Sequence, residues 1–244
     1  MIKMQIEDRN YKVADYLARS HDFYSLNKYK LVMQWLPKQE NLKVLNAGCG
    51  SGEMNLLLAQ NPSWQVEAID IDPEAISLSK QLKEYTGLHN LEVFHSSIED
   101  FQPTVCYDII VSNDVLEHIE DDVNALKILS SWLKPGGYLC ISVPAFQFLF
   151  GYHDRMLGHY RRYSRQSLVN RVAEFLQVRR VRYFGCVLIP VVLFYSTWLQ
   201  KPYPVQQVQK KSFLLECLQK MLAWEVRYGS PWGISLVLLA RKPD

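Results

Sequence analysis

Residues 42–52 have the sequence Leu42-Lys-Val-Leu-Asn-Ala-Gly-Cys-Gly-Ser-Gly52, a short apolar run followed by three closely spaced glycines. The apolar run predicts a buried strand, and residues 54–60 have the composition of a helix that Asn61-Pro62 would stop. Glycines between a strand and a helix allow the backbone to come close to a ligand at the N-terminus of the helix. The stretch therefore predicts a strand, a glycine turn and a helix with a binding function.

The same alternation of strands and helices continues along the chain. Continuous apolar strands such as Asp108-Ile-Ile-Val111 predict burial on both faces of a parallel sheet. We therefore expect an α/β fold with a doubly wound, mostly parallel sheet. The expected strands are 65–70, 91–95, 107–112, 138–143, 177–184 and 234–240, and the expected helices are 9–36, 54–60, 73–86, 121–133 and 164–175.

An acidic residue, Asp70, ends the strand that follows the glycine turn, 18 residues after the last glycine. A carboxylate in this place can accept hydrogen bonds from both hydroxyls of a ribose, so a ligand that carries a nucleoside is predicted. The turn has the pattern GxGxG, with Glu53 where a dinucleotide fingerprint has its third glycine. This difference counts against an NAD-dependent dehydrogenase.

Four stretches resemble, in order and spacing, the successive motifs of class I S-adenosylmethionine-dependent methyltransferases; they are 45–52, 68–73, 107–119 and 133–139. The resemblance implies a seven-stranded, mostly parallel Rossmann-like sheet with S-adenosylmethionine as the cofactor. It also implies a helical N-terminal lid over 1–40 and a cofactor-binding core over 41–184, in which residues 145–164 form an acceptor segment. An apolar helical insertion over 185–230 and a last strand of the core within 231–244 complete the expected chain.

The resemblance implies cofactor contacts for nine residues: Asn46, Ala47, Gly48, Gly50, Asp70, Ile71, Ser97, Ile98 and Asn113. Asp70 would bind the ribose, Ile71 would pack on the adenine, and Asn113 would lie beside the sulfonium. Asn46 stands where an acidic residue is usual; its amide oxygen can accept from an ammonium, or it is a neutral structural variant. Ser97 stands where members often have Asp, so the adenine contact could shift to Glu99.

A second cluster of polar residues, Asp114, Glu117 and His118, follows the predicted strand 107–112. Some relatives, including quinone-biosynthesis and small-RNA methyltransferases, resemble this stretch and use carboxylate and histidine residues there for a divalent metal. The alternative is that His118 lines the cofactor pocket and the carboxylates cap the following helix. We expect the second arrangement and no metal, since one short cluster underdetermines a metal site.

The segment Gly151-Tyr-His-Asp-Arg-Met-Leu-Gly-His-Tyr-Arg-Arg-Tyr-Ser164 follows the fifth strand, at the edge of the sheet where substrates bind in this fold. It resembles a bacterial subgroup with the pattern His-Asp-x4-His-x-Arg-Arg-Tyr, associated with natural-product, glycan or lipid pathways. Members also carry an N-terminal His-aromatic-aromatic stretch, and Ser20-His-Asp-Phe-Tyr24 resembles it.

Two histidines of this segment are candidate general bases, because imidazole suits proton transfer near neutral pH. His153 ranks ahead of His159, since the adjacent Asp154 could orient it. Candidate substrate contacts are Tyr24, Arg155, Tyr160 and Arg161, the arginines being suited to a carboxylate or phosphate. Alternatively, the arginines pair with acidic residues of the first part of the chain and fix a loop over the sheet, and Tyr160 and Tyr163 are packing residues.

The net charge of +2 conceals a division, because residues 1–154 carry a net charge of −9 and residues 155–244 carry +11. Such an asymmetry fits an acidic partner, a membrane surface or internal complementarity. Five cysteines without CxxC spacing and a polar N-terminus favour a reduced, cytoplasmic protein. The apolar insertion has three interpretations: a dimer or lid surface, a contact with lipid or membrane through 185–224, and a buried structural subdomain.

Together these patterns predict a methyltransferase that acts on a small-molecule or lipid- or glycan-linked acceptor, at oxygen, in a biosynthetic pathway. Transfer to nitrogen or carbon and a non-catalytic cofactor-binding scaffold stay as alternatives. No nucleic-acid partner is expected, because Asn113-Asp-Val-Leu116 lacks the Pro-Pro-aromatic motif of base N-methylation. A homodimer and a peripheral membrane location stay open.

Overall fold

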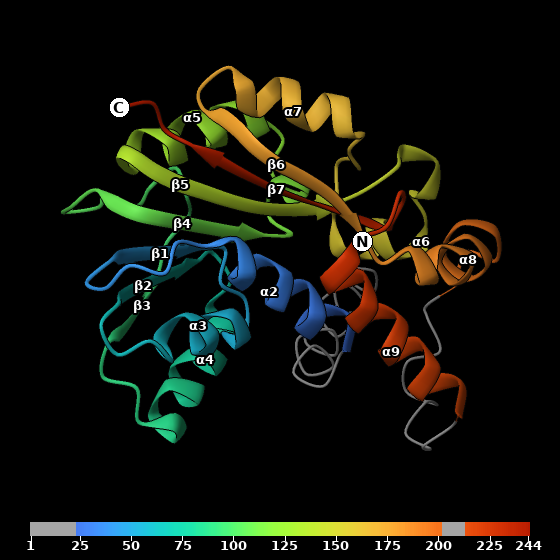
Figure 1. Cartoon of the computed structure of the whole chain (residues 1–244), viewed down its shortest axis with the longest axis horizontal. Coiled ribbons are helices and arrows are strands. Elements are labelled where there is room, and N and C mark those ends of the chain that lie inside the picture. Colours follow the sequence, from blue (N-terminus) through green and yellow to red (C-terminus); the bar gives the residue numbers. More distant parts are fainter. Residues whose placement is uncertain (1–22, 202–212) are drawn as a thin grey trace, which may run out of the picture.

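The computed structural model describes residues 23–201 and 213–244. Seven strands form one sheet in the order β3-β2-β1-β4-β5-β7-β6 (Figure 1). Six strands run in the same direction, and β7 is antiparallel to its neighbours β5 and β6. The strands are β1 (Lys43–Ala47), β2 (Gln65–Asp70), β3 (Leu91–His95), β4 (Tyr107–Asn113), β5 (Leu133–Pro144), β6 (Gln177–Phe184) and β7 (Ser235–Arg241). This arrangement confirms the predicted doubly wound, mostly parallel sheet.

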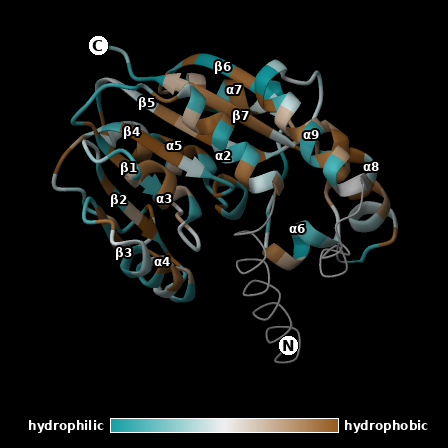
Figure 2. Cartoon of the chain, turned by 60° about the horizontal axis from the view of Figure 1, so that its bottom comes forward, coloured by the Kyte–Doolittle hydropathy of each residue, from teal (hydrophilic) through white to brown (hydrophobic). Residues whose placement is uncertain are grey.

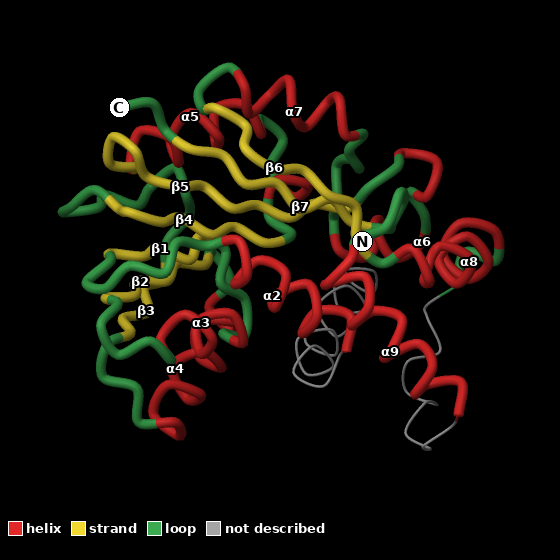
Figure 3. The backbone as a smooth tube through the Cα atoms, viewed as in Figure 1, coloured by secondary structure: helices red, strands yellow, loops and turns green. Residues whose placement is uncertain are grey.

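Helices cover both faces of the sheet, as Figures 1 and 3 show. On one face lie α2 (Phe23–Trp35), α3 (Glu53–Ala59) and α4 (Pro73–Thr86), and on the other lie α5 (Asp122–Trp132) and α7 (Arg165–Ala173). Successive residues of a strand point to opposite faces, so Val44 packs in the first core and Leu45 in the second. Burial on both faces explains the continuous apolar strands of the sequence.

The strand and helix boundaries follow the sequence closely in the cofactor half of the chain. The predicted ranges 65–70, 73–86 and 91–95 are those of β2, α4 and β3. Asp72 caps α4 by accepting from the N–H of Glu74, with Pro73 in the first turn, which is how helices of this composition begin. The largest difference is β5, which starts at Leu133 rather than 138 because Leu133 pairs with Tyr107 before an irregularity in register.

The structure describes the N-terminal part of the chain from residue 23 onward. The predicted helix 9–36 corresponds to α2 over Phe23–Trp35, and residues 9–22 lie outside the described residues. Leu31 and Val32 anchor α2 in the first core, and Lys28 forms a buried ion pair with Asp114 beyond the end of β4. The helix is therefore fastened to the carboxyl edge of the sheet, where the sequence places the binding site.

The insertion between β6 and β7 is helical in its described parts, as predicted. It comprises η3 (Cys186–Leu188), α8 (Ile189–Val191), a π-helical stretch η4 (Val192–Trp198) and α9 (Phe213–Tyr228). Figures 1 and 2 show α8 and α9 at the same end of the molecule. Among the described helices, none combines the length and the apolar character that a membrane crossing requires.

Candidate functional site

The glycine turn between β1 and α3 has a backbone that only glycine adopts readily. Gly48, Gly50 and Gly52 have φ values of 76°, 52° and 100°, all in the left-handed region. A Cβ atom on Gly48 would lie 2.2 Å from Cγ2 of Val115, so the turn also needs the missing side chain for space. The N–H groups of Gly48 and Cys49 donate to the carbonyl of Ile69, which fixes the turn against the end of β2.

Asp70 ends β2 directly beside this turn. Its Oδ2 accepts from the N–H of Gly50 at 2.7 Å, and its Oδ1 accepts from the N–H of Asp72 at 2.9 Å. These bonds hold the carboxylate at the carboxyl end of the strand, where a ribose would meet it. Burial and the Asp70 charge raise the pKa of the Cys49 thiol to about 12, so this cysteine in the turn stays protonated.

Asn46 is oriented by a buried chain of polar side chains. Its amide nitrogen donates to Oδ1 of Asn55 at 2.7 Å, and the amide of Asn55 donates to the hydroxyl of Ser79 at 2.9 Å. With the nitrogen engaged, the oxygen of Asn46 is the atom that can accept from a ligand. The geometry supports a polar contact with an ammonium, without the charge that an acidic residue would bring.

A cavity of about 420 Å³ opens where these elements meet, at the carboxyl ends of β1, β2 and β4. The strand order reverses between β1 and β4, and ligands of doubly wound sheets bind at such a point. Eight of the predicted cofactor residues line it: Asn46, Gly48, Gly50, Asp70, Ile71, Ser97, Ile98 and Asn113. Ala47, the ninth, is instead buried in the core behind the cavity.

Two side chains that line the cavity, those of Asn113 and Ile71, have surroundings that favour a bound ligand. Asn113 is only 8% exposed, and neither amide atom has a hydrogen-bond partner among the described residues. A buried amide in this state is costly unless a ligand satisfies it. Ile71 is 70% exposed, which is unusual for a large aliphatic residue and leaves an apolar surface for a planar ring. Asn113 and Ile71 therefore fit a ligand with a polar centre and an apolar ring.

Residues 38–175, more than half of the chain, match the family model described as "Methyltransferase domain". The chain belongs to the class I S-adenosylmethionine-dependent methyltransferases. S-adenosylmethionine is its cofactor, and the glycine turn, Asp70 and the unsatisfied amide of Asn113 fit that molecule.

Individual relatives agree with the family. The methyltransferase is 33% identical over 102 residues to the "Ubiquinone biosynthesis O-methyltransferase, mitochondrial" of Schizosaccharomyces pombe; the match covers 41% of this chain and only 37% of that protein. It is 24% identical over 166 residues to the "Demethylmenaquinone methyltransferase" of Listeria welshimeri, covering 61% of this chain and 70% of the relative.

A solved structure shares the fold. The N-methyltransferase NodS from Bradyrhizobium japonicum, in complex with S-adenosyl-l-homocysteine, superposes with a TM-score of 0.60 at 17% sequence identity. The superposition covers 91% of this chain and 88% of that protein. At this level of identity the likeness concerns the fold.

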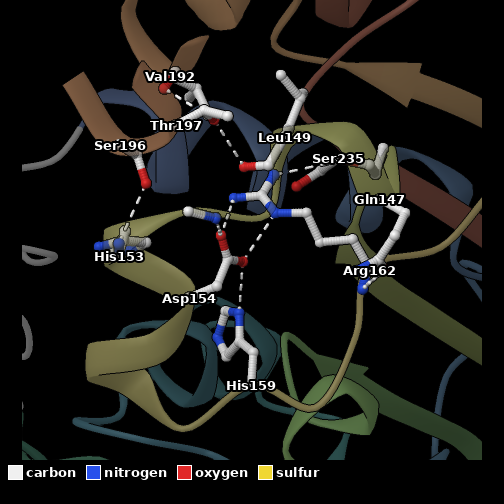
Figure 4. Close-up of polar contacts among 12 residues, drawn as sticks. Gln147, Leu149, His153, Asp154, His159, Arg162, Val192, Ser196, Thr197 and Ser235 are labelled. Carbon is white, nitrogen blue, oxygen red and sulfur yellow. Dashed lines mark hydrogen bonds and ion pairs between the residues drawn. The ribbon is translucent and has the colours of Figure 1, made fainter. Parts of the chain in front are cut away.

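The acceptor segment of the methyltransferase is organised around one buried carboxylate, Asp154 in α6 (Tyr152–Leu157). Figure 4 shows its partners: Arg162 donates through Nε and Nη2 at 2.7 and 2.9 Å, and His159 binds through Nδ1 at 2.8 Å. The N–H of Gly151 donates to it as well. Burial alone would raise the pKa of Asp154, but the bonds from His159, Arg162 and Gly151 hold that pKa well below its usual range.

The histidine that Asp154 binds is His159, whereas the sequence favoured His153 because it adjoins Asp154. Consecutive residues of a helix point about 100° apart and do not face each other. Gly158, with φ 73°, ends α6 in the left-handed conformation and turns the chain back, so that His159 returns to Asp154. His153 instead donates its N–H to the hydroxyl of Ser196 in η4. Asp154 therefore orients His159 rather than the adjacent His153.

Most of the basic side chains in the segment pair with acidic residues, as the alternative interpretation predicts. Arg161 forms an ion pair with Asp122 at 3.1 Å, and Tyr163 donates to the same carboxylate at 2.7 Å. Arg155 is exposed and does not line the cavity. Of the predicted substrate contacts, only Tyr160 lines the cavity.

Tyr24 also lies away from the cavity lining. Its ring stacks on Phe184 with centroids 5.4 Å apart, and its hydroxyl bonds with Ser235 at the start of β7. The rest of the stretch that contains it, residues 20–22, lies outside the described residues. A role for Tyr24 in substrate binding therefore stays a prediction.

A cluster of Glu117, His118 and His159 lies beside the cavity. Each residue offers one ligand atom, and these atoms all lie within 4.8 Å of one another. The rings of His118 and His159 meet edge to face at 4.5 Å, and the N–H of Tyr160 donates to the Glu117 carbonyl. His118 lines the cavity, as the non-metal interpretation predicts.

The cluster differs from the one considered in the sequence. Asp114 is not part of it, because its carboxylate pairs with Lys28 and accepts from Ser142. The expected helix caps also differ, since Asp121 caps α5. His159 takes the place of Asp114 and is 41 residues distant from His118, so local spacing could not reveal it.

Other cavity residues come from segments whose roles the sequence left unassigned. Tyr29 of α2 and Leu157 and Gly158 at the end of α6 also line the cavity. The only sequence signal for them was the glycine at 158, which is typical of a helix end. The helix α2 and the segment 145–164 therefore both contribute residues to the cavity lining.

Proposed function

We propose that this methyltransferase transfers a methyl group to a hydroxyl oxygen of a small-molecule acceptor, free or linked to a lipid or glycan, in a biosynthetic pathway. His159 removes the proton, and Asp154 is the positioning residue that orients it. The observation that carries the proposal is the 2.8 Å bond between Asp154 and His159, whose neighbours Gly158 and Tyr160 line the cavity. An ionised carboxylate on Nδ1 favours the tautomer in which Nε2 is the basic nitrogen.

The chemistry divides between the two sides of the cavity. The cofactor supplies a methyl group already activated by a sulfonium, so the protein has to orient the acceptor and exclude water. Asp70, Asn46, Asn113 and the glycine turn are the residues placed to hold the cofactor. His159 would accept the proton that the acceptor hydroxyl loses when its oxygen takes the methyl group from the bound cofactor. Tyr160, on the cavity wall, is placed to contact the acceptor.

Oxygen as the acceptor atom has support from the relative in Schizosaccharomyces pombe, which is named as an O-methyltransferase. The neighbour NodS is named as an N-methyltransferase, so the fold is compatible with both atoms. The oriented histidine favours oxygen, because an alcohol or phenol benefits from a base more than a neutral amine does.

The test begins with the product. Labelled S-adenosylmethionine is incubated with the enzyme and a cell extract, and mass spectrometry identifies the methylated compound and the atom that carries the label. His159→Asn then keeps a donor for Asp154 and removes Nε2, and we expect kcat to fall about 100-fold or more. His153→Asn is the matched control and should keep most of its activity.

Binding of S-adenosylhomocysteine, measured by calorimetry, should be the same in both variants because neither residue lines the cofactor cavity. Equal loss of kcat in His153→Asn and His159→Asn would contradict the proposed division of roles. A label on nitrogen or carbon would overturn the choice of oxygen.

The Glu117, His118 and His159 cluster favours a second way of activating the acceptor, in which a divalent cation binds these residues. Carboxylate and imidazole donors suit such ions, and Asp154 would then act as the outer carboxylate that orients a histidine ligand. The sequence predicts no metal. Calorimetric titration with Mg²⁺ and Mn²⁺ distinguishes His159 as a general base from His159 as a metal ligand. Binding of either ion that is lost in Glu117→Gln, together with turnover that EDTA abolishes, would favour the metal ligand.

A further inference from the structure

The insertion exposes aromatic side chains that the cofactor site does not use. Phe194 and Trp198 in η4, Trp224 and Tyr228 in α9, and Trp232 before β7 form what we call the aromatic patch. Phe194 and Trp198 contact each other with ring centroids 5.5 Å apart, and Trp224 and Tyr228 do so at 5.3 Å. The patch therefore contains two pairs of exposed rings in contact, one in η4 and one in α9.

The tryptophans of the chain separate into two groups. Trp198, Trp224 and Trp232 are 74%, 57% and 63% exposed. Trp64 is 2% exposed, and Trp35 and Trp132 pack against the two cores. Trp is highly buried on average in proteins, so three exposed ones within a single insertion indicate a surface that meets a partner.

The same helical segments have inner faces that are buried. Val192 and Ser196 of η4 are buried, as are Leu222 and Val226 of α9. These helical segments therefore pack on the protein through other residues, and the exposed rings are not needed for that packing. Figure 2 shows α8 and α9 together at one end of the molecule, so the two parts of the patch lie at the same end.

The excess of basic residues in the insertion favours a negatively charged partner. Among the described residues between 185 and 232, Lys201, Lys220 and Arg227 are basic and exposed, and two residues are acidic, Glu216 and Glu225. Glu225 is buried, and its carboxylate accepts from the N–H groups of Gly185 and Cys186. Aromatic rings that include Trp, together with an excess of Lys and Arg, are the composition of surfaces that bind anionic lipid.

The patch is attached directly to the acceptor segment. The Ser196 hydroxyl accepts from the N–H of His153 at 3.1 Å, and the Thr197 hydroxyl donates to the carbonyl of Leu149 (Figure 4). A Cβ atom on Gly151 would lie 2.3 Å from the Ser196 carbonyl oxygen, so η4 and the start of α6 are in close contact. A partner on the patch would therefore lie beside the segment that we place on the acceptor.

We propose that the aromatic patch docks on the surface of an anionic lipid bilayer and that the acceptor is presented from that bilayer. Tryptophan and tyrosine rings insert at the level of the headgroups, and the basic residues contact lipid phosphates. The second half of this inference rests on the proposed function, whereas the docking itself does not.

The test is flotation of the full chain with vesicles. The protein should float with an equal mixture of phosphatidylcholine and phosphatidylglycerol at low salt, less so at high salt, and poorly with phosphatidylcholine alone. Trp198→Ala combined with Trp224→Ala should weaken binding about 100-fold, on the basis of roughly tenfold for each buried aromatic side chain. Tyr85→Ala is the matched control, because Tyr85 is an exposed aromatic residue on α4.

Failure of the wild-type chain to float at low salt would overturn the docking. So would a dimer, seen by sedimentation, that the double tryptophan variant dissociates, because the patch would then be an interface between copies. Calorimetric binding of S-adenosylhomocysteine by the double variant shows that it is folded. Docking together with a water-soluble methylated product would overturn only presentation from the bilayer.

Discussion

The cofactor rim, formed by the carboxyl ends of β1, β2 and β4, and the acceptor segment, residues 145–164, meet at one cavity but are built differently. In the rim, short-range backbone geometry places the functional groups: three left-handed glycines and the bond from Gly50 to Asp70. In the acceptor segment, side chains distant from each other in the sequence place one another, with Asp154 binding both His159 and Arg162. The rim can therefore be altered one contact at a time, whereas the acceptor segment responds as a unit.

The largest expected effect is on stability, in the acceptor segment. Arg162→Ala leaves the buried carboxylate of Asp154 without its bidentate partner and should lower the free energy of unfolding by about 3–5 kcal/mol. Urea denaturation followed by circular dichroism measures it. Arg155→Ala, on the exposed face of α6, is the control and should change the value by no more than about 0.5 kcal/mol. Equal effects in the two variants would show that Asp154 does not organise the segment.

The next effect is on cofactor binding, in the rim. We propose that Asp70 accepts hydrogen bonds from both ribose hydroxyls, so Asp70→Ala should weaken the binding of S-adenosylhomocysteine about 100-fold. Calorimetry gives the Kd, and Glu92→Gln on the exposed edge of β3 is the control. We expect unfolding by urea to change little in comparison with Arg162→Ala. A large loss of stability in Asp70→Ala would remove the distinction between the two regions.

The smallest effect concerns the dependence of stability on pH. Because the pKa of Asp154 is lowered in the folded state, its ionised form stabilises the protein above the pKa of the unfolded state, and this contribution is lost as the pH falls. The free energy of unfolding should therefore decline more steeply below about pH 4 in the wild type than in Asp154→Asn. Parallel curves for the two proteins, measured by urea denaturation between neutral and acidic pH, would contradict this account.

The same difference explains what the sequence could predict. Strands, helices and the cofactor rim depend on apolar periodicity and glycine turns, which are local, so β2, α4 and β3 and the position of Asp70 were predicted to the residue. The partner of Asp154 and the membership of His159 in the cluster with Glu117 depend on where a loop lies over the sheet. Neighbours in the sequence are poor guides to such pairs, and adjacency favoured the wrong histidine as the partner of Asp154.

The position of β7 has a consequence for the order in which the protein forms. Although β7 follows all the other described strands in the sequence, it lies between β5 and β6 and pairs with both along its whole length. The backbone N–H and C=O groups that face β7 on both strands therefore stay unpaired during synthesis until residues 235–241 leave the ribosome. The insertion, with its exposed tryptophans, is synthesised before that point. A nascent chain stalled before residue 235 would thus present two open strand edges and an aromatic surface at once, which makes residues 235–241 decisive for its solubility.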